Sequence, residues 1–167
     1  YGMGSVGVVL FTNDGGLSWK QQLAGALPGI NQVRFVDPRH GFLLGDGSHA
    51  FPFGVFKTTD SGRSWEPVSG PRTTSWLASD FYDPASGILV GANSRFAAIR
   101  RGQGTRPATA AAAKGAKADP APRAALAEHN AALSGRDILA VQILGKRTLA
   151  VGQGGLILTS VSAGSAW

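Results

Sequence analysis

An eight-residue pattern that occurs twice constrains the fold more than any other feature of the chain. Residues 12–19 and 58–65 both read Thr-x-Asp-x-Gly-x-Ser-Trp, and their tryptophans lie 46 residues apart. This spacing is close to the period of a propeller blade, about 40–50 residues. Residues 160–167 form a degraded third copy, with Ser162 at the aspartate position. We name the three segments box 1, box 2 and box 3. Their repeated positions are Thr12, Asp14, Gly16, Ser18 and Trp19 in box 1, Thr58, Asp60, Gly62, Ser64 and Trp65 in box 2, and Ser160, Gly164 and Trp167 in box 3.

The residue types of the boxes suit a tight turn between two strands. An aspartate carboxylate accepts hydrogen bonds from backbone N–H groups a few residues further along the chain. Glycine permits a positive φ angle, and tryptophan can cover the hairpin with a large apolar surface. We therefore predict that the boxes have a structural role. Because Ser162 supplies no charged acceptor, we expect the box 3 turn to be weaker by about 1 kcal/mol.

Short strands separate the boxes, in an order that repeats along the chain. The chain has 24 glycines in 167 residues, which indicates many tight turns. Segments of alternating apolar residues, separated by Gly, Asp and Pro, are typical of all-β folds. The predicted strands are 30–36, 42–45, 53–57, 76–82, 88–91, 96–99, 138–144, 149–152 and 156–158. They group into a blade end at 1–20 and blades at about 28–66, 73–101 and 137–167. The sequence thus predicts an all-β partial β-propeller of about three and a half four-stranded antiparallel blades.

A basic segment rich in alanine and proline interrupts the blades. We divide the chain into blades with boxes 1 and 2 (1–101), this insertion (102–136) and a further blade with the degraded box 3 (137–167). Flanking Asp, Pro and Gly residues predict a short helix over 120–134. The insertion is either a docking arm for a partner or a neutral surface loop. The candidate docking residues are Arg100, Arg101, Arg106, Lys114, Lys117 and Arg123.

The boxes resemble the Asp-box (BNR) repeat. Residues 151–157 read Val-Gly-Gln-Gly-Gly-Leu-Ile, which is similar to a blade phrase of the photosystem II stability/assembly factor-like family. That resemblance implies an exported propeller, commonly seven-bladed, in the periplasm, the lumen or outside the cell. It also implies a non-catalytic platform for protein binding or assembly, with a protein partner that could be a membrane complex. The chain departs from the family in its insertion and in its degraded or missing boxes.

The Asp-box also occurs in sialidases and other glycosidases, so glycan binding or hydrolysis is the alternative function. A sialidase needs a tyrosine nucleophile beside a glutamate, and a paired-carboxylate glycosidase needs two acids across a cleft. The available residues, Tyr1, Tyr82, Glu66 and Glu128, do not form such a pattern. We therefore predict no catalytic residues. The candidates for a glycan site would be Trp76, Arg95 and Asp80.

Metal, cofactor and nucleic-acid sites are not indicated by the sequence. The chain has no cysteine, and the aspartates of boxes 1 and 2 each stand alone instead of in an alternating acidic loop. The glycines at 152–155 lack the Lys-Ser/Thr ending of a phosphate loop. Basic residues of the insertion are not interleaved with aromatic ones, which disfavours nucleic acid.

Nothing in the sequence indicates a membrane anchor. No apolar run approaches the ~20 residues that span a bilayer, and no signal peptide is visible. Because a partial ring would expose sheet edges, we expect the rest of the propeller to lie outside this chain.

Overall fold

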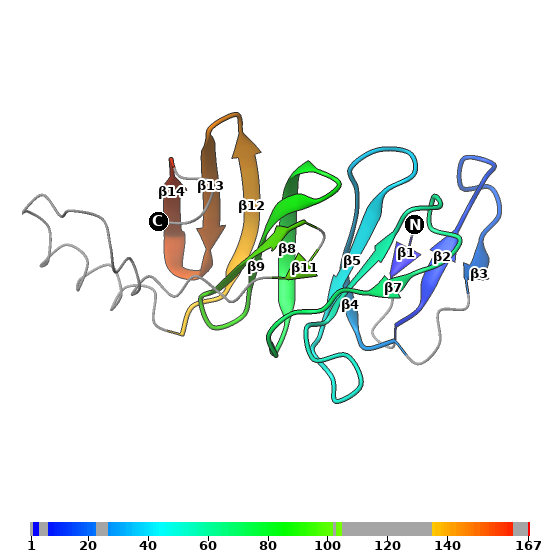
Figure 1. Cartoon of the computed structure of the whole chain (residues 1–167), viewed down its shortest axis with the longest axis horizontal. Coiled ribbons are helices and arrows are strands. Elements are labelled where there is room, and N and C mark those ends of the chain that lie inside the picture. Colours follow the sequence, from blue (N-terminus) through cyan, green and yellow to red (C-terminus); the bar gives the residue numbers. More distant parts are fainter. Residues whose placement is uncertain (1, 4–6, 23–26, 102, 105–134, 162–166) are drawn as a thin grey trace, which may run out of the picture.

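Four antiparallel sheets follow one another along the chain in the computed structural model (Figure 1). The structure describes residues 2–3, 7–22, 27–101, 103–104, 135–161 and 167. The sheets lie side by side in sequence order along the long axis of the molecule. This arrangement confirms the predicted fold class, an all-β assembly of partial propeller blades.

Each sheet is a simple meander of neighbouring strands. Sheet 1 contains β1 (Gly2–Met3), β2 (Val9–Phe11) and β3 (Lys20–Gln22). Sheet 2 contains β4 (Ile30–Phe35), β5 (Gly41–Gly45), β6 (Val55–Thr58) and β7 (Glu66–Pro67). Sheet 3 contains β8 (Trp76–Asp83), β9 (Ser86–Gly91), β10 (Arg95–Arg100) and β11 (Gln103–Gly104). Sheet 4 contains β12 (Ile138–Leu144), β13 (Arg147–Gly152) and β14 (Leu156–Ser160), with a 3-10 turn at Gln153–Gly155.

The strand register repeats from sheet to sheet. The first residue of each opening strand pairs with the glycine that ends the second strand: Ile30 with Gly45, Trp76 with Gly91, and Ile138 with Gly152. A register shift follows directly in all three sheets. A side chain at these glycines would collide with a backbone carbonyl at the start of the same sheet. The shared register therefore lets residues of different sheets be compared position by position.

Hydrophobic clusters fill the spaces between neighbouring sheets. Side chains of sheets 1 and 2 form one cluster, sheets 2 and 3 the largest, and sheets 3 and 4 another. At the centre of the largest cluster, the fully buried Trp76 of β8 lies edge-on to Phe53 and donates its Nε1–H to the Phe53 carbonyl at 2.7 Å. Burial of apolar area between the sheets is thus the main stabilising contribution to this arrangement.

The structure bears on one of our two expectations about the insertion, its boundary at residue 101, and does not describe the residues of the other. Strand β11 extends sheet 3 to Gly104, so the third blade continues past residue 101, where we placed the boundary. The predicted helix at 120–134 lies outside the described residues. The described part of the chain contains no helix with the length and apolar character that a bilayer span requires.

Candidate functional site

Boxes 1 and 2 form the same hydrogen-bonded turn. In box 1, the carboxylate of Asp14 accepts bonds from the Thr12 hydroxyl at 2.7 Å, the Ser18 amide at 2.9 Å and the Ser18 hydroxyl at 2.5 Å. The Thr12 hydroxyl oxygen in turn accepts from the Gly16 amide at 2.9 Å. The corresponding distances in box 2 are 2.7, 2.9, 2.6 and 2.9 Å. The carboxylate and hydroxyl groups of each turn are thus engaged within the turn itself, as expected of a structural element.

These hydrogen bonds act on the ionisation of the box aspartates. Bonds from Ser18 lower the pKa of Asp14 to about 2. The equivalent bonds from Ser64 hold the pKa of Asp60 well below its usual range. Hydrogen bonding to the charged form of a carboxyl favours that form. Both carboxylates are therefore charged near neutral pH, and their lone pairs already have local donors.

Sheets 3 and 4 show what happens where the box is altered. In sheet 2, Thr58 of box 2 pairs with Gly41. The equivalent pair in sheet 3 is Ile99 of β10 with Gly87, so an apolar side chain replaces the hydroxyl at the first box position. The chain then turns directly into β11, with Arg100 opposite Gln103. In box 3, Ser160 is buried and Trp167 packs on Phe96 of β10, with ring centroids 4.7 Å apart. Gly164 lies outside the described residues. The tryptophan of box 3 thus contributes to the contact with sheet 3.

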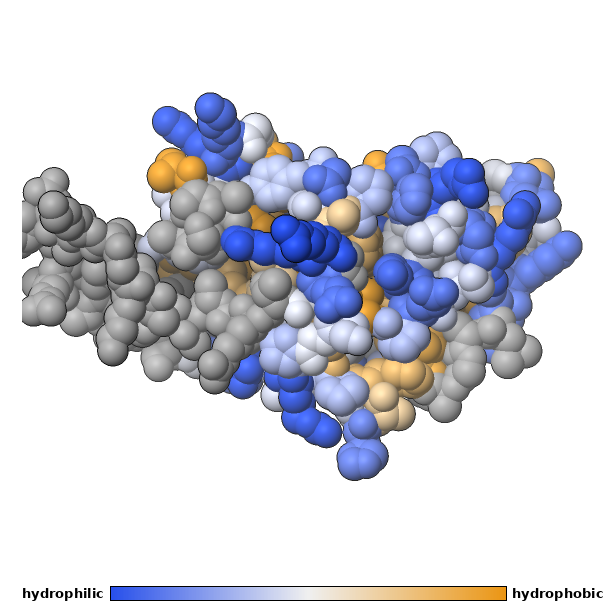
Figure 2. All heavy atoms as spheres, viewed as in Figure 1, coloured by the Kyte–Doolittle hydropathy of each residue, from blue (hydrophilic) through white to orange (hydrophobic). Residues whose placement is uncertain are grey.

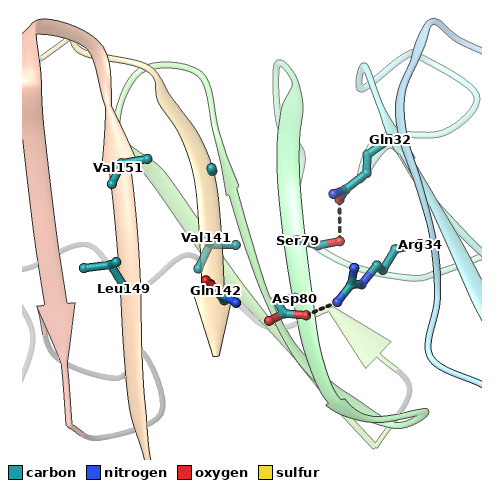
Figure 3. Close-up of a pocket in the computed structure, with 9 residues that line it drawn as sticks. Gln32, Arg34, Ser79, Asp80, Val141, Gln142, Leu149 and Val151 are labelled. Carbon is teal, nitrogen blue, oxygen red and sulfur yellow. Dashed lines mark hydrogen bonds and ion pairs between the residues drawn. The ribbon is translucent and has the colours of Figure 1, made fainter. Parts of the chain in front are cut away.

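A cavity lies where the opening strands of sheets 2, 3 and 4 come together (Figure 3). Of these strands, β8 contacts both β4 and β12, whereas β7 lies at the other edge of its sheet. The cavity has a volume of about 310 Å³. It is lined by Gln32, Arg34, Ser79, Asp80, Ala140, Val141, Gln142, Leu149 and Val151. Polar side chains of β4 and β8 occupy one side, and the other side combines the polar Gln142 of β12 with aliphatic side chains of β12 and β13. We call this site the inner cavity.

Asp80 connects three sheets at the inner cavity. Its Oδ1 accepts a hydrogen bond from Nη2 of Arg34 at 2.8 Å, across the boundary between sheets 2 and 3. Its Oδ2 accepts from the backbone amide of Ile143 in β12 at 2.8 Å. The Asp80 side chain is only 11% exposed, while that of Arg34 is 51% exposed. The Phe81 amide also donates to Oδ1 of Asp80, at 3.0 Å. Asp80 is therefore held in place by three partners, and half of the Arg34 side chain remains exposed to solvent.

Neighbouring contacts hold the cavity walls in a defined geometry. The Ser79 hydroxyl donates to the Gln32 amide oxygen at 2.6 Å. The Asn31 side-chain amide donates to the Ser75 hydroxyl at 2.8 Å and to the Trp76 carbonyl at 3.0 Å. All of these bonds join sheet 2 to sheet 3 or to the residue that leads into it. These hydrogen bonds connect sheet 2 to sheet 3 beside the inner cavity.

The three candidates for a glycan site are not brought together. Trp76 is fully buried between sheets 2 and 3, where its ring cannot stack on a sugar. Arg95 opens β10 and does not line the inner cavity, whereas Asp80 does. The phenol of Tyr82 lies 3.2 Å from the hydroxyl of Thr148, and Glu66 is exposed in β7. Of the described residues that line the cavity, Asp80 is the single carboxylate.

The remaining candidate residues do not form a site within the described structure. Arg100 and Arg101 are exposed at the turn between β10 and β11, and the docking candidates Arg106, Lys114, Lys117 and Arg123 lie outside the described residues. Over the described ranges, no group of three or more His, Asp or Glu side chains is placed to hold a metal ion.

One contact was not foreseen from the sequence: Nδ1 of His40 lies 2.8 Å from Oδ2 of Asp37. The bonds from the Arg39 and His40 amides, and then from the His40 ring, lower the pKa of Asp37.

Sequence reasoning missed most of the cavity-lining residues. The available signal was a register comparison of the opening strands, because Arg34, Asp80 and Gln142 occupy the same position in β4, β8 and β12. Three polar residues at one repeated position, next to positions that are mostly apolar, indicate a shared polar surface. That signal becomes visible only after the three sheets have been aligned.

Comparison with known proteins gives a likeness of fold. No family model matches the chain, and no curated protein matches its sequence. Among the solved structures that do match is a chain described as YCF48 bound to D1 peptide, with a TM-score of 0.54 and 17% sequence identity. The match covers 83% of this chain and 39% of the YCF48 chain, so this chain spans well under half the length of that neighbour. The likeness supports a propeller-like fold.

Proposed function

We propose that this chain is a non-catalytic protein-binding module, and that it holds a segment of its partner in the inner cavity. The observation that carries the proposal is the composition of the cavity. Amide and guanidinium groups of Gln32 and Arg34 stand opposite the aliphatic side chains of Leu149 and Val151, and the Gln142 amide lies beside Leu149, its cross-strand partner. A peptide presents backbone amides and carbonyls together with apolar side chains, and this mixed lining can satisfy both.

The engaged state of Asp80 supports binding over hydrolysis. General acid–base catalysis needs a carboxyl group that can exchange a proton with substrate, and glycoside hydrolysis usually needs a second carboxyl nearby. Asp80 is occupied by Arg34 and by the amide of Ile143. By contrast, the free side of the Arg34 guanidinium can donate to a carbonyl or carboxylate of a bound segment.

The broader role that fits this site is assembly or stabilisation of a protein complex. The chain resembles the photosystem II stability/assembly factor-like family in the Val-Gly-Gln-Gly-Gly-Leu-Ile run at 151–157, and a similar solved chain is YCF48 bound to D1 peptide. On this basis we propose a protein partner, with a membrane complex as one candidate, and an exported location such as the periplasm. Glycan binding is the second candidate, because the polar side chains of the inner cavity could also bind hydroxyl groups.

A peptide library displayed on phage tests the proposal directly. Peptides selected on the purified chain should also bind it in solution, as measured by calorimetry. A glycan array run in parallel tests the second candidate function. Substitution Gln142→Trp places a large ring at the cavity without touching the buried core, since Gln142 is exposed. The matched control is Gln21→Trp, an exposed glutamine of β3 that does not line the inner cavity.

The two variants should separate the outcomes clearly. We expect Gln142→Trp to weaken the selected peptides at least about tenfold and Gln21→Trp to leave their affinity unchanged. Equal affinity for both variants would contradict binding at the inner cavity. A specific glycan that binds where no peptide does, with the same sensitivity to Gln142→Trp, would favour the second candidate.

A further inference from the structure

A second cavity lies between sheets 1 and 2, at the edge that carries β3 and box 2. Its volume is about 470 Å³. One wall consists of residues of β2, β3 and box 1, and the other is the turn of box 2. The cavity shares no lining residue with the inner cavity, which lies beside the opposite edge of sheet 2. We call it the rim groove.

The rim groove belongs to the contact that sheets 1 and 2 make with each other. Phe11 of β2 lies two residues after Val9, so both side chains are on the same face of the sheet. Val9 is buried in the cluster between sheets 1 and 2, which identifies this face as the one turned toward sheet 2. The side-chain amide of Gln22 donates to the Gly62 carbonyl of box 2 and joins the two walls. The groove therefore lies between two neighbouring sheets and not on an outer face of the first or last sheet.

The charged side chains of the rim groove are positive. Lys20 lines it from β3 and Arg63 from box 2, and none of the described lining residues carries a carboxylate. Both cations are exposed, and within the described structure neither side chain has a hydrogen bond or an ion pair. In Figure 2, hydrophilic side chains cover the end of the molecule formed by β2 and β3. Asp14 and Asp60 of the neighbouring boxes already accept hydrogen bonds within their own turns. The two cations are thus available to an anionic ligand.

The repeat shows that this arrangement of charge is specific to the rim groove. Phe11 and Lys20, which flank box 1, form a cross-strand pair in sheet 1. The pair that flanks box 2 in the same way is Lys57 with Glu66, and their charged groups lie 3.9 Å apart. In sheet 2 the cation therefore has a carboxylate as its cross-strand partner. In sheet 1 the same two positions hold an aromatic ring and an ammonium group.

The uncharged side chains of the rim groove favour a ligand rich in hydroxyl groups. Asn13, Gln21 and Gln22 line it, and an amide side chain can both donate and accept hydrogen bonds, as a sugar hydroxyl does. The half-buried ring of Phe11 adds a flat apolar surface. The described lining residues include no aliphatic side chain of the kind that lines the inner cavity. The apolar side chains of a peptide would therefore find fewer partners here than a sugar ring would.

We propose that the rim groove binds an acidic saccharide, a sugar chain that carries carboxylate or sulfate groups. Lys20 and Arg63 hold the anionic group from the two walls, and the guanidinium fork of Arg63 matches a pair of anionic oxygens. The amides bind ring hydroxyls, and the apolar side of a sugar ring lies on Phe11. The inference goes beyond peptide binding at the inner cavity and does not rest on it.

Calorimetric titration of the full chain with defined sugars tests the proposal. The probes are trigalacturonic acid and sulfated maltotriose, each beside its neutral counterpart, the methyl ester of the first and maltotriose itself. We expect at least one acidic sugar to bind and its neutral counterpart to bind at least about tenfold more weakly, since the charge-assisted hydrogen bonds are lost. The affinity should also fall with added salt, because the two cations are exposed.

A pair of double variants assigns the binding to the rim groove. Lys20→Gln/Arg63→Gln removes both cations but keeps long polar side chains, and should raise the dissociation constant at least about tenfold. The matched control, Arg72→Gln/Lys146→Gln, removes the same charge at exposed positions that line neither cavity, and should leave the affinity unchanged. Gln142→Trp, at the inner cavity, should leave it unchanged as well. Equal denaturation midpoints confirm that both double variants are folded.

Four results would overturn the proposal. The first is that neither acidic sugar binds, and the second is that a neutral counterpart binds as tightly as the acidic form. The third is an equal loss of affinity in the two double variants, which would indicate attraction to the overall positive charge of the chain. The fourth is a hexaglutamate peptide that binds as tightly as the sugars and loses affinity in Lys20→Gln/Arg63→Gln, which would make the groove a site for acidic peptides. None of these results bears on peptide binding at the inner cavity, which Gln142→Trp tests separately.

Discussion

Box 2 and the inner cavity lie at opposite edges of the same sheet and are built in different ways. Box 2 joins β6 to β7, and its bonds run between residues two to four positions apart. The inner cavity lies beside β4, and its bonds, such as Arg34 to Asp80, join residues more than forty positions apart. The box is complete within one turn, whereas the cavity exists only when three sheets are packed together. The more conspicuous sequence feature is therefore scaffold, and the candidate for function is the less conspicuous one.

The contact between sheets 2 and 3 should contribute most to stability, because the inner cavity depends on it. Trp76→Ala removes a fully buried ring and its hydrogen bond to the Phe53 carbonyl. We expect a loss of about 3–5 kcal/mol in the free energy of unfolding, measured by chemical denaturation. The matched control, Trp19→Ala, removes a half-exposed ring of box 1 and should cost less than about 1 kcal/mol. Equal losses in the two variants would show that the boxes matter as much as the contact between sheets.

Removal of the Asp80 carboxylate should have the next largest effect. Asp80→Ala leaves the half-buried amide of Ile143 without its acceptor and releases Arg34. We expect a loss of about 1–3 kcal/mol in the free energy of unfolding and weaker binding of cavity-selected peptides. Asp83→Ala, in which an exposed carboxylate loses the single bond from the Ala85 amide, is the control and should change both quantities less. Unchanged peptide affinity in Asp80→Ala would separate this residue from the binding site.

Neutralising a box aspartate should affect stability alone. Asp60→Asn weakens the acceptor for the Thr58 and Ser64 donors, so the denaturation midpoint should fall, by less than in Asp80→Ala. Peptide affinity should remain at the wild-type value, because box 2 does not line the inner cavity. A loss of peptide affinity at unchanged stability would reverse the proposed roles of the two regions.

The smallest effect is a dependence of stability on acid pH. The pKa of Asp14 is lowered to about 2 by its bonds to Ser18 and Thr12, against an unfolded value of about 3.9. The folded state therefore binds its proton less readily, and the stabilisation is complete above the unfolded pKa and is lost as the pH falls through the folded pKa. The double variant Asp14→Asn/Asp60→Asn should show a shallower decline of the denaturation midpoint between about pH 5 and pH 2. An unchanged slope would mean that other carboxyl groups account for the acid sensitivity.

The sequence predicted the fold well because the information for each strand and turn is local. We recognised each box and each alternating strand from residues that are neighbours in the sequence. The same holds for the strand end at Gly152. The inner cavity was not predicted, since nothing near Asp80 in the sequence indicates that Arg34 and Ile143 are its partners. We considered Trp76 for a sugar site because the sequence around a single tryptophan does not indicate whether its ring is buried or exposed. Long-range packing decided both cases.

The most direct test of the account is the position of a bound peptide on the chain. Amide chemical shifts of the isotope-labelled full chain, recorded during titration with a library-selected peptide, locate the contact residue by residue. We predict that the largest changes fall on the amides of β8 and β12 around Ser79, Asp80, Val141 and Gln142, with boxes 1 and 2 nearly unaffected. Changes concentrated in boxes 1 and 2, with β8 and β12 silent, would contradict the assignment of scaffold and binding site.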